Sequence, residues 1–213
     1  SGKSTLIQHF NALIQPTSGT VSYNGEDVWA EKYDRRKLRS EVGLVFQYPE
    51  HQLFESDVLS DVCFGPMNQG MTREQAEEEA RKALHHVGFK EENFDKSPFE
   101  LSGGMCQRVG IAMAMTFQPK LLLADEPTSA LDVTTQAQIV RQMMELRDDF
   151  GTGIIVVTHN IGVAAYMADK LLVMRQGKVV DSGQREDILY NPQSEYTKNL
   201  LASVPALKGE RYV

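Results

Sequence analysis

Hydrophobic residues change their spacing along the chain in a way that separates helices from strands. Continuous apolar runs predict buried strands at Val42–Phe46, Leu121–Ala124 and Ile154–Thr158. A helical pattern over 134–149 lies between the last two runs. Because a strand, a helix and a second strand in succession are typical of a parallel sheet, this pattern predicts an α/β core.

The chain begins with a polar, glycine-containing segment that leads into a helical pattern. Apolar residues recur at helical spacing after Ser1–Thr5, before Pro16–Gly19 ends the pattern: Leu6, Ile7, Phe10, Leu13 and Ile14. A short strand that closes in a turn is predicted at Gly19–Gly25.

Strand signals are absent from Tyr48 to about Met115, where helical patterns take over. Thr72–Gln75 has the form of a capping box, and an apolar stripe follows it up to Gly88. We therefore expect an inserted helical subdomain over 48–115.

The remaining residues, 1–47 and 116–213, are expected to form the core of the same domain. Toward the end of the chain, Leu171–Met174 and Lys178–Val180 predict a hairpin. A terminal helical region is predicted from Asp187 to Leu201.

Composition places the chain among folded, soluble proteins. Its 213 residues are 41% hydrophobic and 24% charged, which excludes the disordered and fibrous classes. The net charge of -7 argues against nucleic acid as the main partner. No apolar run approaches the roughly 18 to 20 residues that cross a bilayer, so a membrane role must come through a partner. Cys63 and Cys106 lack metal-ligand spacing and favour a reduced, cytosolic setting.

The first candidate for chemistry is Gly2–Lys3–Ser4, the end of the phosphate-binding pattern G-x-x-x-x-G-K-[ST]. In that loop, backbone N–H groups surround phosphates, the lysine meets the β and γ oxygens, and the hydroxyl holds Mg²⁺. The three residues alone occur by chance in about one chain in ten of this length. They therefore need support from a second motif.

That support comes from Asp125–Glu126, which follow the apolar run Leu121–Ala124. The carboxyl end of a parallel strand is where α/β proteins bind ligands. Consecutive strand residues point to opposite faces, so the two carboxylates are expected to differ in role, Asp125 toward Mg²⁺ and Glu126 toward the attacking water. A surface Asp-Glu pair is the alternative.

Leu101–Met105 contains Ser102, Gly103 and Gly104 just before a second helical pattern. Two glycines permit close approach of a ligand, and a serine at a helix N-terminus adds a hydroxyl to unpaired N–H donors. The alternative is an ordinary helix cap.

Taken in order, these motifs resemble the ATP-binding subunits of ABC transporters, and the resemblance covers the whole chain. The matching elements are Ser1-Gly2-Lys3-Ser4-Thr5 (Walker A remnant), Gln47 (Q-loop), Leu101–Gly104 (signature), Asp125-Glu126 (Walker B and catalytic glutamate), Ser129–Asp132 (D-loop) and His159 (switch histidine). Met105 stands where glutamine is usual in the signature.

The resemblance implies a P-loop NTPase with a RecA-like parallel sheet. It implies a dimer, either of two copies or with a second ATPase subunit, in which ATP lies between the phosphate loop of one subunit and Ser102-Gly103-Gly104 of the other. Glu126, His159 and Gln47 would then be catalytic, Ser4, Gln47 and Asp125 would hold Mg²⁺, and Asp132 would assist across the dimer. Transmembrane permease subunits complete such an importer, which places the protein at the cytoplasmic face of the cell membrane.

Two branches of this family contribute features. Segments of the first half resemble energy-coupling-factor ATPases, which serve vitamin and cobalt or nickel uptake: Phe46–Phe54, Phe64–Pro66 and Lys96–Glu100. Segments of the second half are similar to dipeptide, oligopeptide and nickel importer ATPases: Met105–Arg108, Ala130–Gln136, Glu195–Thr197 and Leu200–Pro205. A hybrid chain is one hypothesis that accounts for both.

Two other classes are weighed against the importer subunit, namely a non-transport ABC ATPase and another P-loop enzyme such as a small-molecule kinase. The first would show a long coiled-coil insertion, duplicated cassettes or a basic face, and the second does not need the signature motif. The chain starts inside Walker A, so we expect an N-terminally truncated domain that by itself binds ATP weakly and is inactive.

Overall fold

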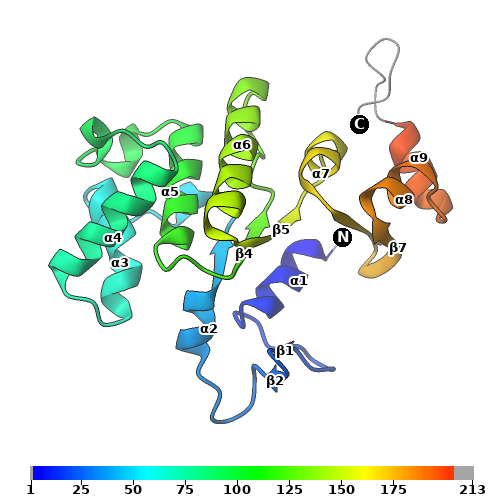
Figure 1. Cartoon of the computed structure of the whole chain (residues 1–213), viewed down its shortest axis with the longest axis horizontal. Helices are drawn as coiled ribbons and strands as arrows, with labels where there is room; N and C mark the ends of the chain where they lie inside the picture. The colour runs from blue at the N-terminus through cyan, green and yellow to red at the C-terminus, as the bar shows by residue number, and fades with distance from the viewer. Residues whose placement is uncertain (1, 204–213) are drawn as a thin grey trace. The chain divides into compact units, whose positions relative to one another are not determined.

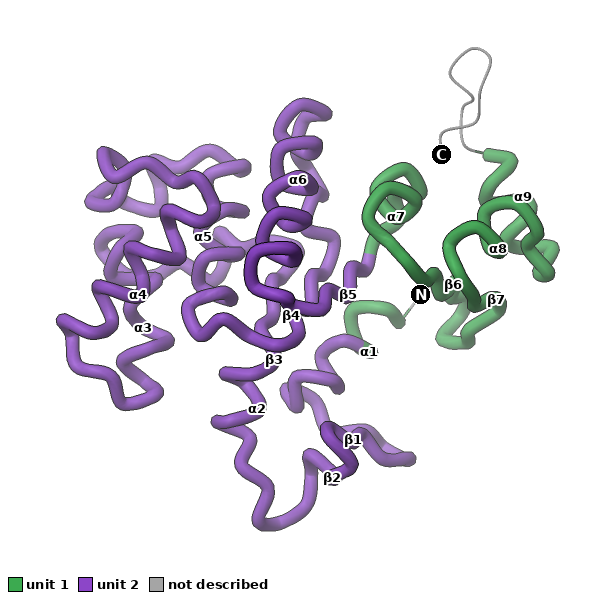
Figure 2. The backbone as a smooth tube through the Cα atoms, in the orientation of Figure 1, with its two compact units in different colours: residues 1–6, 158–213 green, residues 7–157 purple. Residues whose placement is uncertain are grey.

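The computed structural model describes residues 2–203, so Ser1 and the Val204 and Pro205 of the predicted tail lie outside the described part. The chain divides into two compact units, residues 1–6 with 158–213, and residues 7–157 (Figure 2). The helical segment 48–115 belongs to the same unit as the parallel sheet. The predicted boundaries at 47/48 and 115/116 stay a prediction.

The larger unit contains a three-stranded parallel sheet in the order β3-β4-β5. Its strands are β3 (Val42–Val45), β4 (Leu121–Asp125) and β5 (Gly153–Val157). Leu122, Leu123 and Ala124 in β4 are fully buried, as their apolar run predicts. The α/β prediction is confirmed, because helices separate these parallel strands along the chain (Figure 1).

The expectation that Ile154–Thr158 is a fully buried strand is wrong in part. Ile155 is 38% exposed, and its neighbours Ile154 and Val156 are half-buried. β5 pairs with β4 on one side only among the described strands. The apolar run therefore identified the strand correctly but predicted more burial of its side chains than the structure shows.

Helix α1 (Lys3–Phe10) is shorter than its apolar spacing predicts. The chain leaves the helix because Ala12 adopts a left-handed conformation with φ 53°. The Asn11 amide donates to the carbonyl oxygen of Val42 at 2.7 Å, which ties this end to β3. Leu13 and Ile14 are consequently 44% and 40% exposed.

Short elements connect α1 to the sheet. The predicted strand at Gly19–Gly25 is confirmed as β1 (Ser22–Tyr23), which pairs antiparallel with β2 (Glu26–Asp27). Helix α2 (Arg35–Glu41) follows, and Asp34 caps its N-terminus.

The segment between β3 and β4 is helical, as expected (Figure 1). The predicted capping box is present, with Thr72 and Gln75 bonding each other's backbone at the start of α4. The elements of this segment are η1 (Pro49–His51), α3 (Val58–Asn68), α4 (Arg73–His86), η2 (Glu91–Asn93), η3 (Pro98–Glu100) and α5 (Gly103–Met115). The predicted helix at 134–149 is α6 (Val133–Phe150), which packs against α5.

In the described part of the smaller unit, β6 (Lys170–Arg175) and β7 (Lys178–Gln184) form the hairpin that the sequence predicts. Helix α7 (Ile161–Met167) precedes them and was not predicted. The terminal helical region is present as two helices, α8 (Arg185–Tyr190) and α9 (Glu195–Ala202). The buried carboxylate of Asp181 in β7 accepts hydrogen bonds from the backbone N–H groups of Gln193 and Ser194 at 3.0 and 3.1 Å. These bonds fix the start of α9 on the hairpin.

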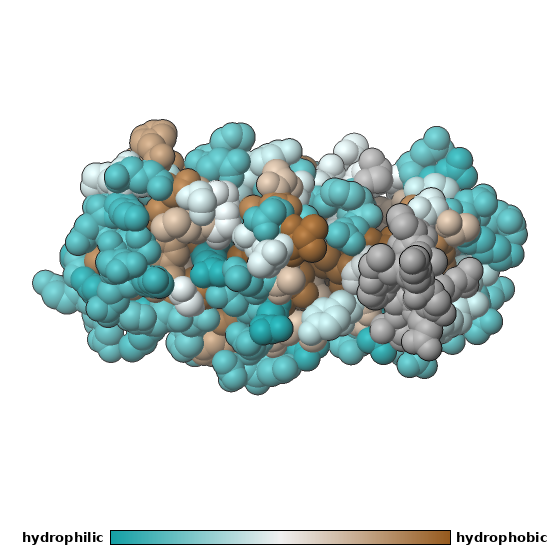
Figure 3. All heavy atoms as spheres, turned by 90° about the horizontal axis from the view of Figure 1, so that it is seen from above, coloured by the Kyte–Doolittle hydropathy of each residue, from teal (hydrophilic) through white to brown (hydrophobic). Residues whose placement is uncertain are grey.

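The surface view shows how hydrophilic and hydrophobic residues are distributed on one face. On the face drawn in Figure 3, hydrophilic residues cover most of the described surface, and hydrophobic residues reach it between them. No helix within residues 2–203 is both long and apolar enough to cross a membrane.

Candidate functional site

The N-terminal candidate residues lie in the smaller unit, at the start of α1. Gly2 has φ 81°, a conformation that glycine adopts without strain, and α1 begins at Lys3. The first N–H groups of a helix have no partner within it, so the start of α1 offers donors to an anion. The Lys3 ammonium donates to the carbonyl oxygen of Thr158 at 2.9 Å. Lys3 is thereby held beside the residue that precedes His159.

His159 is exposed and lies in the short segment between β5 and α7. Asn160, which follows it, accepts a hydrogen bond from the Val163 N–H and caps α7. The Thr158 hydroxyl accepts from the Asn160 N–H at 3.0 Å. The backbone on the C-terminal side of His159 is therefore anchored by local hydrogen bonds.

In the larger unit, Gln47, Asp125 and Glu126 gather at the carboxyl edge of the sheet. Gln47 follows β3, Asp125 is the last residue of β4, and β3 and β4 are parallel neighbours with Val45 opposite Ala124. The Gln47 amide donates to the hydroxyl of Ser129 at 3.4 Å. Asp125 is buried. The two strands and one hydrogen bond thus bring the predicted Q-loop and Walker B residues to one edge.

Glu126 has a left-handed backbone with φ 49°, so it does not continue the strand as the sequence argument assumed. Its N–H donates to the carbonyl oxygen of Val157 at 2.7 Å, and its own carbonyl accepts from the Ser129 N–H at 2.9 Å. The left-handed region costs a non-glycine residue about 1 to 2 kcal/mol, and such strain is concentrated at functional sites. Strand alternation, which the sequence argument assumed, therefore does not set the direction of the Glu126 side chain.

The signature residues form the N-terminus of α5. The Ser102 hydroxyl accepts a hydrogen bond from the Met105 N–H at 3.4 Å, which is the helix cap weighed above as an alternative. Ser102 and Gly103 are exposed. The helix cap does not exclude a ligand site. The Ser102 hydroxyl binds one of the unpaired N–H groups at the N-terminus of α5 and leaves the others available.

Asp132 caps α6, and its carboxylate accepts two hydrogen bonds from Thr135. It accepts from the Thr135 N–H at 3.0 Å and from the Thr135 hydroxyl at 2.6 Å. The hydroxyl bond, followed by the backbone bond, lowers the pKa of Asp132. Sequence reasoning missed Thr135, although Asp132 and Thr135 have the spacing of a helix cap and its third residue.

Each unit therefore assembles part of the predicted set. The smaller unit holds Gly2–Thr5 and His159, and the larger unit holds Gln47, Ser102–Gly104, Asp125, Glu126 and Asp132. Within residues 2–203, no group of three or more His, Cys, Asp or Glu side chains could hold a metal.

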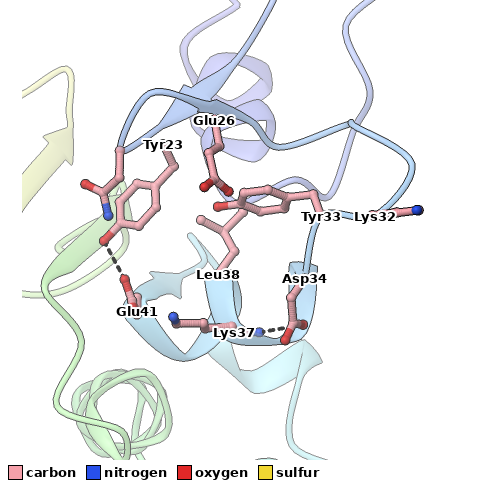
Figure 4. A pocket seen from close by; sticks show the side chains of 9 residues that line it. Tyr23, Glu26, Lys32, Tyr33, Asp34, Lys37, Leu38 and Glu41 are labelled. Carbon is pink, nitrogen blue, oxygen red and sulfur yellow. Dashed lines mark hydrogen bonds between the residues drawn. The ribbon is translucent and has the colours of Figure 1, made fainter.

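A cavity of about 320 Å³ in the larger unit contains none of these residues. It lies between the β1-β2 hairpin and α2, with Tyr23, Tyr33 and Glu26 around it (Figure 4). The Tyr23 hydroxyl donates to Glu41 at 3.0 Å across one side. This bond, with Lys120 as the next contributor, lowers the pKa of Glu41.

Comparison with known proteins identifies the class. A family model described as ABC transporter matches residues 1–129. The chain belongs to the ABC transporter ATP-binding proteins and has the α/β P-loop NTPase fold of that family.

Several relatives are named as ATP-binding proteins of energy-coupling factor transporters. EcfA2 of Bacillus subtilis (strain 168), an energy-coupling factor transporter ATP-binding protein, is 47% identical over 88% of this chain and 69% of its own length. The EcfA2 of Caldanaerobacter subterraneus subsp. tengcongensis is 42% identical over 97% of this chain and 72% of its own length. The chain thus spans about two thirds of the length of these relatives, and 65% of the EcfA2 of Bacillus cereus.

Two solved structures are similar. CbiO1 from Clostridium perfringens, described as part of the ABC transporter complex cbiONQ, has a TM-score of 0.78 and 34% identity, covering 88% of this chain and 74% of that one. The ATP-binding cassette MJ0796, a dimer in a post-hydrolysis state with ADP and Pi, has a TM-score of 0.75 and 29% identity, covering 86% and 81%. The hybrid origin of the chain stays a prediction.

Proposed function

We propose that this chain binds and hydrolyses ATP as the motor subunit of an energy-coupling-factor importer, and couples hydrolysis to solute uptake. The observation that carries the proposal is the meeting of Gln47, Asp125 and the strained Glu126 at one edge of the parallel sheet. The names of the relatives support the transporter type.

Each candidate residue has a role that its position supports. The N–H groups at the start of α1 and the Lys3 ammonium bind phosphate oxygens. Glu126 orients the attacking water and accepts its proton, Gln47 positions the same water, and His159 donates to the γ-phosphate region. Catalysis in this class is positioning and charge stabilisation, which suits a site built from backbone amides and fixed side chains.

The residues present fit a magnesium ion. Mg²⁺ prefers oxygen ligands and is bound by one or two carboxylates together with substrate phosphates, so a cluster of three acidic residues is not needed. Of the predicted ligands, Gln47 and Asp125 offer an amide oxygen and a carboxylate at one edge of the sheet, and Ser4, in the smaller unit, has a hydroxyl of the required type. Bound there, the ion would neutralise charge on the β and γ oxygens.

A second ATPase subunit completes the site through Ser102, Gly103 and Gly104. Phe99, three residues before Ser102, is 97% exposed, and Val133, the first residue of α6, is 83% exposed. Exposed apolar residues beside an anion-binding helix end favour a surface that a protein partner covers. The dimeric state of the similar cassette MJ0796 supports this arrangement.

The helical segment 48–115 contains the surface that would bind the permease. Phe54 and Phe64 are 61% and 41% exposed and contact each other edge to face, with ring centroids 4.8 Å apart. Aromatic residues are enriched at protein interfaces. The protein would then act at the cytoplasmic face of the membrane, and the solute would be a vitamin or metal ion rather than a peptide.

The test is Glu126→Gln in the transporter assembled with its membrane partners. We expect ATP hydrolysis to fall by about 100-fold or more, the contribution of a general base, while ATP binding persists. Glu145→Gln, on the exposed face of α6, is the matched control and should hydrolyse at the wild-type rate. Undiminished hydrolysis in Glu126→Gln would contradict the proposal.

A further inference from the structure

Gly104, the second glycine of the signature turn, lies against Thr135 at the start of α6. A Cβ atom at position 104 would stand 2.6 Å from Cγ2 of Thr135, closer than carbon atoms approach in proteins. The same Cβ would be 3.9 Å from both Cβ and Oγ1 of Thr135, an ordinary contact. The methyl group of one threonine therefore accounts for the absence of a side chain at position 104.

That methyl group is held in place by Asp132. The Thr135 hydroxyl donates to Oδ2 of Asp132 at 2.6 Å, while the Thr135 N–H donates to Oδ1 at 3.0 Å. Rotating the threonine to move its methyl away from Gly104 would break the hydroxyl bond. Because a β-branched side chain has few allowed rotamers in a helix, the methyl has no inexpensive alternative position.

A second contact connects the same two segments. A Cβ atom at Gly103 would lie 3.4 Å from Cδ2 of Leu131, the residue before Asp132. Both glycines of the signature turn thus pack on the residues around the start of α6, within one compact unit.

We propose that Thr135, whose rotamer Asp132 fixes, is a positioning residue that holds the signature turn in place. The position of this turn determines where Ser102 and the N-terminal N–H groups of α5 contact the nucleotide. This inference rests on the proposed ATPase function. It assigns Asp132 a role inside its own subunit, through Thr135, and explains the glycine at 104 by packing.

Substitutions at Gly104 and Thr135 distinguish the effect of the Thr135 methyl group from that of its hydroxyl. Gly104→Ala places a methyl against Cγ2 of Thr135. Thr135→Ser keeps the hydroxyl for Asp132 and removes Cγ2, whereas Thr135→Val loses the hydroxyl and retains a methyl at both γ positions. Only the serine variant can therefore relieve the clash in a double mutant.

The experiment measures melting temperature and steady-state ATPase activity against ATP concentration, in the transporter assembled with its partners. We expect Gly104→Ala to lower kcat/KM for ATP by about tenfold, mainly through a higher KM. A displaced signature turn would weaken nucleotide binding equally in the ground state and the transition state. Thr135→Ser alone should cost less than about threefold, and Gly104→Ala with Thr135→Ser should recover to within about threefold of wild type. Thr134→Ser, at the exposed neighbouring position, is the control for hydroxyl chemistry.

Three results would overturn the proposal: Gly104→Ala as active as wild type, a double mutant with serine no better than Gly104→Ala, or equal rescue by serine and valine. Recovery of melting temperature without recovery of activity would show that the ligand itself requires the glycine, and would also refute the positioning role. A wild-type transporter that hydrolyses no ATP would instead refute the proposed function, and the melting temperatures would still decide the packing claim.

Discussion

Asp61 provides a prediction whose size can be worked out from the structure. This residue of α3 is fully buried, and its Oδ1 atom accepts hydrogen bonds from the N–H groups of Phe54 and Glu55 at 3.0 and 3.1 Å. Asp61→Ala would leave both partly buried N–H groups without their acceptor. Each such loss costs about 1 kcal/mol at the lower end of the range for buried donors, so the free energy of unfolding should fall by about 2 kcal/mol.

Asp61→Asn separates the hydrogen bonds from the charge. Because one oxygen accepts both bonds, the amide oxygen of asparagine can replace it. A loss of about 2 kcal/mol corresponds to a melting temperature about 4 to 8 °C lower in a protein of this size, and we expect that loss for alanine only. Asp95→Ala, at an exposed carboxylate, is the control and should melt within about 1 °C of wild type.

The two Asp61 variants should also differ in their pH dependence. Burial raises the pKa of Asp61 above its usual value, and Glu55 and Asp57 act in the same direction. A carboxyl with a raised pKa binds its proton more tightly in the folded state, so its stabilising contribution is greatest below the unfolded pKa and is lost as the pH rises through the folded pKa. The asparagine variant should therefore gain stability relative to wild type as the pH rises above about 4, the ordinary pKa of an aspartate.

Thermal melts of wild type and the three variants across that pH range test the whole argument. An asparagine variant as unstable as the alanine variant would refute it, because the ionised second oxygen would then have to bind a group of its own. A relative stability that falls with rising pH would contradict the direction of the pKa change.

Backbone conformation gives two further predictions, both read from melting temperatures. Ala130 has φ 60°, so Ala130→Gly should stabilise the protein by about 0.5 to 1 kcal/mol. Ala137→Gly, on the exposed face of α6, should instead destabilise it by about 1 kcal/mol. Melting temperatures that change in the same direction for both variants would refute the strain argument. Gly151 ends α6 at φ 64°, and no atom beyond its chain neighbours lies within 4 Å of the position that an alanine methyl would take. Gly151→Ala should therefore lower the free energy of unfolding by about 1 kcal/mol, from backbone conformation alone. An unchanged melting temperature would contradict this.

Residue patterns predicted the strands well where burial is complete. β3 and β4 have nearly continuous apolar residues because helices or strands surround them, and the runs at Val42–Phe46 and Leu121–Ala124 identify both. β5 has the same kind of run, and yet Ile155 is exposed. The sequence shows which residues favour a strand, but the burial of each face of that strand depends on which helices or strands pack against it.

The candidate site shows the same division between residue identity and geometry. Motif order selects Gln47, Asp125 and Glu126, and the parallel strands explain why they meet at one edge. The left-handed backbone of Glu126 was not foreseeable, because glutamate has no preference for that conformation. Its backbone is bonded there to Val157 and Ser129. Tertiary contacts, rather than local propensity, determine this part of the site.

The loop between β4 and α6 connects the edge of the sheet that holds the proposed catalytic residues to the signature turn. It begins at the strained Glu126, passes through the left-handed Ala130, and ends at Asp132, which fixes Thr135 against Gly104. Hydrogen bonds hold both ends of this loop, from the Glu126 N–H to Val157 and from the Thr135 hydroxyl to Asp132, so its two left-handed residues are kept in place by tertiary and capping contacts. The residue proposed to position the attacking water and the contact that positions the signature turn therefore lie at the two ends of one loop.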